Sequence, residues 1–151
     1  MVHPAILETA EAFGETNCQV DAARIVELCR HLKDNEGFVR LSAVTAVDRF
    51  PAEPRFEIVY HLHAFDTKVV NLAPRRLRLK CLLGAADPEI DSVTGVWRSA
   101  NWYEREVFDM FGVKFRNHPN LQRILMPVDW DGYPLRKDYP VHGYKYGYAS
   151  E

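Results

Sequence analysis

The sequence predicts an α+β domain over residues 1–115, in which helices cover one face of a small, mostly antiparallel sheet. Three consecutive segments alternate apolar and polar residues with the period of two that half-buried strands show. Apolar residues spaced three and four apart before and after these segments are typical of amphipathic helices. Residues 116–151 have neither period, and we expect them to form an extended, irregular C-terminal arm.

The N-terminal part is predicted to contain two helices around a short strand. Residues 4–13 are expected to form a short helix, because Pro4 suits a first helical turn and Gly14 suits a left-handed exit. Residues 15–20 are expected to form an edge strand. Asp21 is a suitable N-cap for the second helix. The apolar stripe of that helix consists of Ala22, Ile25, Val26, Cys29 and Leu32.

Three strands are predicted over residues 38–48, 55–65 and 76–83. The connections between them are too short for a crossover helix, which favours an antiparallel meander. In the first strand, one face is expected to carry Val39, Leu41, Ala43, Thr45 and Val47, and the other Arg40, Ser42 and Asp48. The basic residues near the third strand are expected to be solvated, or else to form a patch for an acidic partner or a nucleic acid: Arg75, Arg76, Arg78 and Lys80.

A loop over residues 84–95 precedes a further helix that is expected to begin at Asn101. Asn101 and Glu104 have the spacing of a capping box, and Gly112 suits the position after the last helical turn. Arg105 and Asp109 are four residues apart, so we expect them to form an ion pair on the helix surface.

The arm combines four prolines with many apolar side chains, and most aromatic residues of the chain, including all three tryptophans, lie after residue 95. Exposing such side chains to water costs about 25 cal/mol per Å² of apolar surface. The arm must therefore dock, either on its own domain or on another protein. Arginine beside tryptophan and tyrosine is typical of protein–protein hot spots, which favours a partner.

Composition and motifs exclude several classes. The net charge of −2 and the pI of about 6.3 argue against a general nucleic-acid binder. Neither a membrane-spanning run nor a signal peptide is expected. The three cysteines are far apart and odd in number, which indicates a reducing compartment rather than a disulfide framework. The sequence has no phosphate-binding glycine loop and no nucleophile elbow.

Two groups of residues could support chemistry. His61 and His63 point to the same face of a strand, a geometry that metals use, but no third ligand has a clear spacing, so ordinary strand histidines are favoured. Glu106 and Asp109 could form a carboxylate pair for acid–base catalysis, with His118 as a further candidate. No nucleophile or metal cluster accompanies them, so structural roles are favoured.

Several blocks in the last third of the chain resemble the C subunit of NADH-quinone oxidoreductase, the 30 kDa subunit family of respiratory complex I. The blocks are NWYEREVFDMFG (101–112), His118-Pro119, Arg123-Ile124-Leu125, Asp129-Trp130 and PLRKDYP (134–140). The strands and the first part of the chain agree more loosely. Gln122 stands where the family usually has a basic residue, so a contact at that position is expected to differ.

The resemblance implies a cofactor-free subunit of the peripheral arm of a proton-pumping complex, with a structural or assembly role beside the large quinone-cavity subunit, which is called D. It implies that electrons pass from NADH through FMN and Fe–S clusters in other subunits to quinone, and that this chain alone is inactive. The implied partners are the D, B and I subunits, without nucleic acid. The implied location is the cytoplasmic side of the bacterial inner membrane, reached only through the complex.

Two alternatives stay open at this point. One is the equivalent subunit of a related membrane-bound hydrogenase or of a dehydrogenase that uses another donor. The other is a stand-alone acid–base enzyme. Under the favoured interpretation, the residues expected to orient the motif helix or to contact a partner are Trp102, Glu104, Arg105, Glu106, Asp109, His118, Arg123, Asp129, Trp130, Tyr133, Arg136, Lys137, Asp138 and Tyr139.

Overall fold

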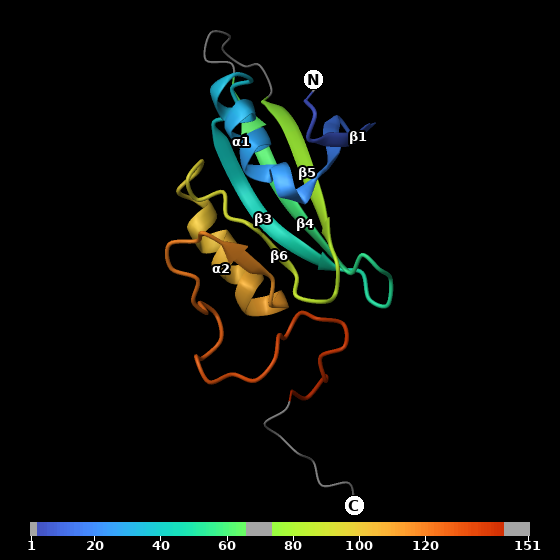
Figure 1. Cartoon of the computed structure of the whole chain (residues 1–151), viewed down its shortest axis with the longest axis vertical. Helices are drawn as coiled ribbons and strands as arrows, with labels where there is room; N and C mark the ends of the chain where they lie inside the picture. The colour runs from blue at the N-terminus through green and yellow to red at the C-terminus, as the bar shows by residue number, and fades with distance from the viewer. Residues whose placement is uncertain (1–2, 66–73, 144–151) are drawn as a thin grey trace, which may run out of the picture.

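The computed structural model describes residues 3–65 and 74–143, and there the chain forms a five-stranded sheet with two helices on one face (Figure 1). In chain order the elements are β1 (Ile6–Ala12), β2 (Glu15–Val20), a 3-10 helix (Ala22–Arg24), α1 (Ile25–Asp34), β3 (Arg40–Asp48), β4 (Phe56–Ala64), β5 (Arg75–Leu83), β6 (Glu89–Asp91), α2 (Ala100–Phe111) and β7 (Lys114–Arg116). The strand order is β1-β2-β5-β4-β3, and only β2 and β5 are parallel neighbours. The predicted α+β class with a mostly antiparallel sheet is confirmed.

The predicted meander is formed by β3, β4 and β5, and its apolar face makes the core with both helices. Alternate residues of β4 and β5 are fully or almost fully buried, as the period of two predicts. Helix α1 buries Ile25, Leu28, Cys29 and Leu32, close to the predicted stripe. Asp21 caps the preceding 3-10 turn, because its carboxylate accepts a hydrogen bond from the backbone N–H of Ala23 at 3.0 Å.

The prediction of a helix over residues 4–13 is wrong, because residues 6–12 form strand β1. β1 pairs with β2 through a two-residue turn at Phe13 and Gly14, whose φ angles are 54° and 71°. Two positive φ angles suit the right-handed twist of a hairpin. Gly14 was expected to end a helix, and a helix end and a hairpin turn both need a residue in the left-handed region. The strand prediction for residues 15–20 is confirmed, but β2 is not an edge strand because β1 lies outside it.

Strand β3 contains a β-bulge that reverses the predicted faces of its second half. The register with β4 shifts between Leu41 and Ala43. Beyond the shift, Val44, Ala46 and Asp48 are buried, whereas Thr45 and Val47 are exposed. One extra residue in a strand turns every later side chain to the opposite face. The bulge therefore carries Asp48, which was expected on the polar face, into the interior.

The loop predicted over residues 84–95 contains strand β6, which pairs in parallel with β7 in a small second sheet. All three cysteines are free and buried. Within the described ranges, no helix is both long and apolar enough to cross a bilayer.

The arm has no helix or strand over residues 117–143, as expected. In Figure 1 this orange-to-red stretch runs from β7 below α2 and on to the nearby end of the main sheet. Residues 144–151, with Tyr144, Tyr146 and Tyr148, lie outside the described residues. The role of residues 116–151 as a partner-docking unit stays a prediction.

Tyr60 provides a test of the core. Its side chain is fully buried in β4, and its hydroxyl has no hydrogen-bond partner in the described part of the chain. A buried hydroxyl without a partner costs free energy. We therefore expect Tyr60→Phe to raise the free energy of unfolding by about 1 kcal/mol. Tyr60→Ala, which removes the ring as well, should lower it by about 4 kcal/mol. Chemical denaturation measures both, and a clear loss of stability in Tyr60→Phe would contradict this description.

Candidate interaction site

Most of the residues that the sequence singled out meet where α2 and the arm pack against each other. We call this region the α2–arm junction: helix α2 (Ala100–Phe111), Gly112 and arm residues 117–143. Figure 1 shows the arm passing around the end of α2. The backbone N–H of Leu135 donates to the carbonyl of Met110 at 3.1 Å, which ties the far part of the arm back to the helix.

The carboxylate of Asp109 is the anchor of the junction. Its side chain is fully buried, and Oδ2 accepts hydrogen bonds from three successive backbone N–H groups, those of Ile124, Leu125 and Met126, at 2.9, 2.7 and 2.9 Å. Burial by itself raises the pKa of this carboxyl, but these bonds and Arg123 outweigh it, so that the pKa lies below its ordinary value. The carboxylate therefore stays ionised and holds one turn of the arm.

Arg123 extends this anchor along the arm. Its Nη1 donates to Asp109 Oδ1 at 2.7 Å, and its Nη2 donates to the carbonyls of Trp130 and Gly132 at 3.2 and 3.0 Å. The guanidinium also lies 5.3 Å from the ring centre of Tyr133. One arginine thus fixes two separate stretches of the arm. The predicted ion pair between Arg105 and Asp109 is wrong, because Asp109 turns to Arg123 instead.

Gly112 lets the arm approach the end of α2 closely. Its φ of 73° ends the helix as predicted. A Cβ at this position would lie 2.5 Å from the ring of Tyr133 and 2.7 Å from Nη2 of Arg136. Arg136 stacks on Tyr133 with its guanidinium 4.6 Å from the ring centre, and its Nε donates to the carbonyl of Phe111 at 2.6 Å. Tyr133 and Arg136, which the sequence predicts to contact a partner, therefore pack against their own chain.

A second anchor joins the arm to the main sheet. Arg55 donates to both carboxylate oxygens of Asp48, at 2.9 and 2.8 Å, and to both of Asp138, at 3.0 and 2.7 Å. The backbone N–H of Lys137 donates to Asp48 at 2.8 Å. Hydrogen bonding from Arg55 holds the pKa of Asp48 well below its ordinary value. Sequence reasoning missed Asp48 and Arg55 as site residues, since the bulge that buries Asp48 leaves no mark in the alternation.

Glu104 is fully buried on the opposite side of α2 and does not cap the helix. The N-cap is Ser99, and the capping box predicted at Asn101 is wrong. The carboxylate of Glu104 accepts hydrogen bonds from the Ser92 hydroxyl at 2.6 Å and from the Val93 backbone N–H at 2.7 Å. Burial raises the pKa of Glu104 to about 7, and the two hydrogen bonds offset this only in part. Glu104 thus ties the loop before α2 to the helix.

His118 lies beside Glu104 with its side chain fully buried, 3.9 Å from Nε2 to Oε2. Its Nδ1 accepts a hydrogen bond from the backbone N–H of Asn120 at 3.0 Å, so the proton of the neutral ring belongs on Nε2. That nitrogen is 3.1 Å from the carbonyl of Asn101. Burial lowers the pKa of His118, which favours this neutral form.

The other predicted residues lie at the rim of the junction. Trp102 is 61% exposed and packs under the guanidinium of Arg105, which donates to the carbonyls of Gln122 and Arg123. The Tyr139 hydroxyl donates to the carbonyl of Asp131 at 3.4 Å. Besides Trp102, the exposed residues of the predicted set are Glu106, Asp129, Lys137 and Asp138.

Acid–base catalysis by Glu106 and Asp109 finds no support in this geometry. Glu106 is exposed, and Asp109 already accepts hydrogen bonds from three backbone N–H groups and Arg123. His63 hydrogen-bonds Ser42 at 2.7 Å, and His61 lies 4.0 Å from Glu15. Over residues 3–65 and 74–143, no group of three or more histidine, cysteine, aspartate or glutamate side chains could hold a metal ion.

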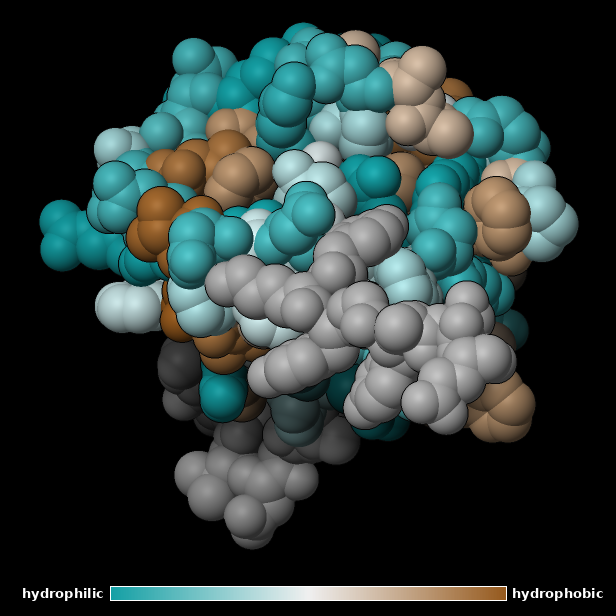
Figure 2. All heavy atoms as spheres, turned by 90° about the horizontal axis from the view of Figure 1, so that it is seen from below, coloured by the Kyte–Doolittle hydropathy of each residue, from teal (hydrophilic) through white to brown (hydrophobic). Residues whose placement is uncertain are grey.

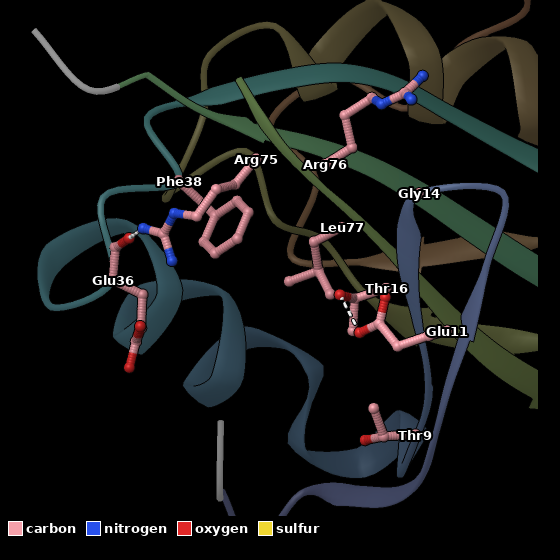
Figure 3. A pocket seen from close by; sticks show the side chains of 9 residues that line it. All are labelled: Thr9, Glu11, Gly14, Thr16, Glu36, Phe38, Arg75, Arg76 and Leu77. Atoms are coloured by element: carbon pink, nitrogen blue, oxygen red, sulfur yellow. Dashed lines mark hydrogen bonds between the residues drawn. The ribbon is translucent and has the colours of Figure 1, made fainter. Parts of the chain in front are cut away.

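A cavity of about 470 Å³ lies between β1, β2, β5 and the segment before β3 (Figure 3). Arg75 donates to the carbonyl of Glu36 and lies over the ring of Phe38, 5.1 Å from its centre. Arg76 points away from Arg75. The neighbouring basic residues Arg78 and Lys80 pair with Glu15 and Glu57 at 2.6 and 3.4 Å. Two of the four basic residues of this strand are therefore paired with carboxylates of the same chain.

Asp109→Asn tests the first anchor. The amide keeps the shape but removes the negative charge from four donors, so we expect the arm to lose about 3 kcal/mol of docking stability. Hydrogen exchange should become faster at the amides of residues 124–126 and stay unchanged in β4 and β5. Glu106→Gln, which removes an exposed charge from the same helix, is the matched control. Unchanged exchange in Asp109→Asn would contradict the role given to this carboxylate.

Glu104→Gln tests the buried carboxyl through pH. The folded protein keeps the proton up to about pH 7, whereas the ordinary pKa is 4.5, so ionisation opposes folding and stability falls as the pH rises between these values. The amide cannot ionise and still matches Ser92 and Val93. We expect the variant to be more stable than the parent above pH 7, by roughly 2–3 kcal/mol, and the difference to shrink towards pH 4.5. His118 is the same in both proteins, and a difference independent of pH would contradict the assignment.

Comparison with known proteins agrees with the family that the motifs suggested. The model of the family described as "Respiratory-chain NADH dehydrogenase, 30 Kd subunit" matches residues 18–145. The C subunit of NADH-quinone oxidoreductase from Citrifermentans bemidjiense is 48% identical over 139 residues, 92% of this chain and 83% of that protein. The C 2 subunit from Rhizobium etli is 49% identical over 142 residues, 93% of this chain and 72% of that protein.

A solved structure is also similar. It is that of a trypsin-resistant fragment (1-134) of Nqo5, which has a TM-score of 0.66 and 30% sequence identity, covering 76% of this chain and 89% of the fragment. The family match over most of the chain, the relatives and the shared fold lead to one assignment. The chain belongs to the family of the 30 kDa subunit of respiratory-chain NADH dehydrogenase, and is a subunit of NADH-quinone oxidoreductase.

Proposed function

We propose that this chain is a non-catalytic subunit that helps to assemble and position the peripheral arm of the complex, and that its C-terminal arm docks on the D subunit. The proposal rests on the different orientations of the polar and the apolar side chains of the arm. Its polar side chains anchor it to the same chain, while large apolar side chains point outward. The outward apolar residues of the arm are Leu125, Val128, Leu135 and Val141.

The exposure of these side chains supports a partner surface. Val128 and Val141 are 94% and 96% exposed, and Leu125 and Leu135 are 59% and 54% exposed. Figure 2, which views the molecule from the arm end, shows hydrophobic side chains (brown) among hydrophilic ones (teal) on the part of this face that the grey residues leave visible. Interfaces between proteins combine apolar contacts with a polar surround in this way. An arm already held in place also loses less conformational freedom on binding.

The same proposal includes what the resemblance implied for the complex. The B and I subunits are further partners, electrons pass through FMN and Fe–S clusters of other subunits to quinone, and this chain binds no cofactor. Its location is peripheral, on the cytoplasmic side of the inner membrane. The anchoring roles of Asp109, Glu104 and Arg123 support a structural subunit, because the hydrogen bonds of these groups are directed at the chain itself.

Val128→Asp tests the docking of the arm. The side chain is exposed, so the variant should keep the melting temperature of the parent, but a carboxylate in an apolar contact with the D subunit should weaken co-purification at least tenfold. Leu7→Asp places the same change on β1, where Leu7 is 66% exposed, and is the matched control. The co-purified amount of the D subunit is measured by quantitative mass spectrometry. Normal recovery of that partner with Val128→Asp would refute docking through this surface.

A further inference from the structure

A shallow groove beside the α2–arm junction is lined by charged side chains of one sign only. It lies between the end of α1, the start of β3 and the segment that leads into α2, and its volume is about 850 Å³. We call it the cationic groove. Its lining comprises Lys33, Val39, Arg40, Leu41, residues 94–99 and Tyr103. The three charged side chains among them, Lys33, Arg40 and Arg98, are all cations.

Within the described ranges, these cations lack carboxylate partners like those of Arg78 and Lys80 on β5. Lys33 donates to the carbonyl of Val96 at 2.5 Å, and Arg40 and Arg98 are exposed without an ion pair. No aspartate or glutamate is among the described residues that line the groove. A cluster of like charges is unfavourable unless an opposite charge approaches it. In a chain of net charge −2, this local excess points to an anionic ligand.

The segment that leads into α2 forms one side of the groove. Trp97 lines the groove but is only 4% exposed, and its indole nitrogen is buried. Ser99 is the N-cap of α2, and its hydroxyl donates to the carbonyl of Leu41 at 3.4 Å. Because Ser99 lines the groove, the positive end of the α2 dipole lies in the same region as the three cations.

The shape of the groove favours a polypeptide as the ligand. β3 is an edge strand with β4 as its neighbour on one side, so an extended segment can lie along its start. Val39, which is 57% exposed, precedes Arg40 there and offers an apolar contact beside the charge, whereas Leu41 is buried in the core. We infer that the cationic groove binds an acidic, extended segment of another subunit of the complex.

This site is separate from the surface proposed for the D subunit. The arm is anchored at Asp48, the last residue of β3, whereas the groove lies at Arg40, the first. Eight steps of a strand span roughly 27 Å. Substitution of Arg40 therefore leaves the anchor at Asp48 in place, and the two proposals can fail independently.

The first experiment measures binding of a defined acidic probe to the full chain. The probe is a fluorescein-labelled decapeptide of alternating glutamate and alanine, titrated by fluorescence anisotropy at low and moderate salt. The double variant Arg40→Gln with Arg98→Gln should lower the affinity about tenfold, and the affinity of the parent should fall with salt. Arg49→Gln with Arg76→Gln removes two exposed positive charges elsewhere and should stay within twofold of the parent. Equal losses in the two double variants, or no loss in either, would overturn the inference.

The second experiment identifies the ligand in the purified complex. A benzophenone amino acid in place of Val39, which is exposed in the groove and carries none of its charge, is photo-crosslinked, and the products are identified by mass spectrometry. The inference predicts a crosslink to an acidic segment of a different subunit. A crosslink to a second copy of this chain, to a non-acidic segment or to phospholipid, or no crosslink, would overturn it. Sedimentation with phosphatidylglycerol vesicles that depends on Arg40 and Arg98, without peptide binding, would assign the groove to a membrane surface instead.

Discussion

The buried carboxylate of Asp109 determines where residues 117–143 run. This stretch has no regular backbone ladder of its own, so its N–H groups need acceptors from elsewhere. A single oxygen of Asp109 accepts three consecutive N–H groups, and the other oxygen pairs with Arg123. Arg123 in turn reaches the carbonyls of Trp130 and Gly132. One negative charge on the last turns of α2 therefore organises two stretches of the arm.

A second charged cluster fixes the far part of the arm to the sheet. Asp48, Arg55 and Asp138 form it, with two carboxylates on one guanidinium and the Lys137 N–H on Asp48. The cluster exists because the bulge in β3 turns Asp48 inward, next to the start of β4. Because one anchor lies on α2 and another on the sheet, the path of the arm is fixed before any partner binds. A partner therefore meets a preformed surface rather than a chain that it must order.

The period of the apolar residues predicted the helices and strands that have one buried face. The prediction failed at a hairpin turn, at a β-bulge and at the start of a helix. The three meander strands and the stripe of α1 were found because buried residues recur at fixed intervals. Gly14 misled because helix ends and hairpin turns both use positive φ. The bulge after Leu41 has no signal in the sequence, so the alternation assigned Asp48 to the polar face of the strand. Glu104 fitted a capping box, but the helix begins two residues earlier than that motif requires. The sequence identified the site residues on helix α2. It did not predict that most of their contacts are made within the same chain.

Helix α2 carries two fully buried carboxyl groups whose pKa values are shifted in opposite directions. Asp109 has a cation and three N–H donors, so its pKa is lowered and its charge persists at neutral pH. Burial raises the pKa of Glu104 to about 7, because its two donors are neutral and offset the burial only in part. Protonation of His118 at Nδ1 would break the bond from the Asn120 N–H, because that nitrogen is the acceptor. The hydrogen bonds from the arm to Asp109 are thus insensitive to pH near neutrality, while the Glu104 carboxyl, which holds the loop before α2, titrates there.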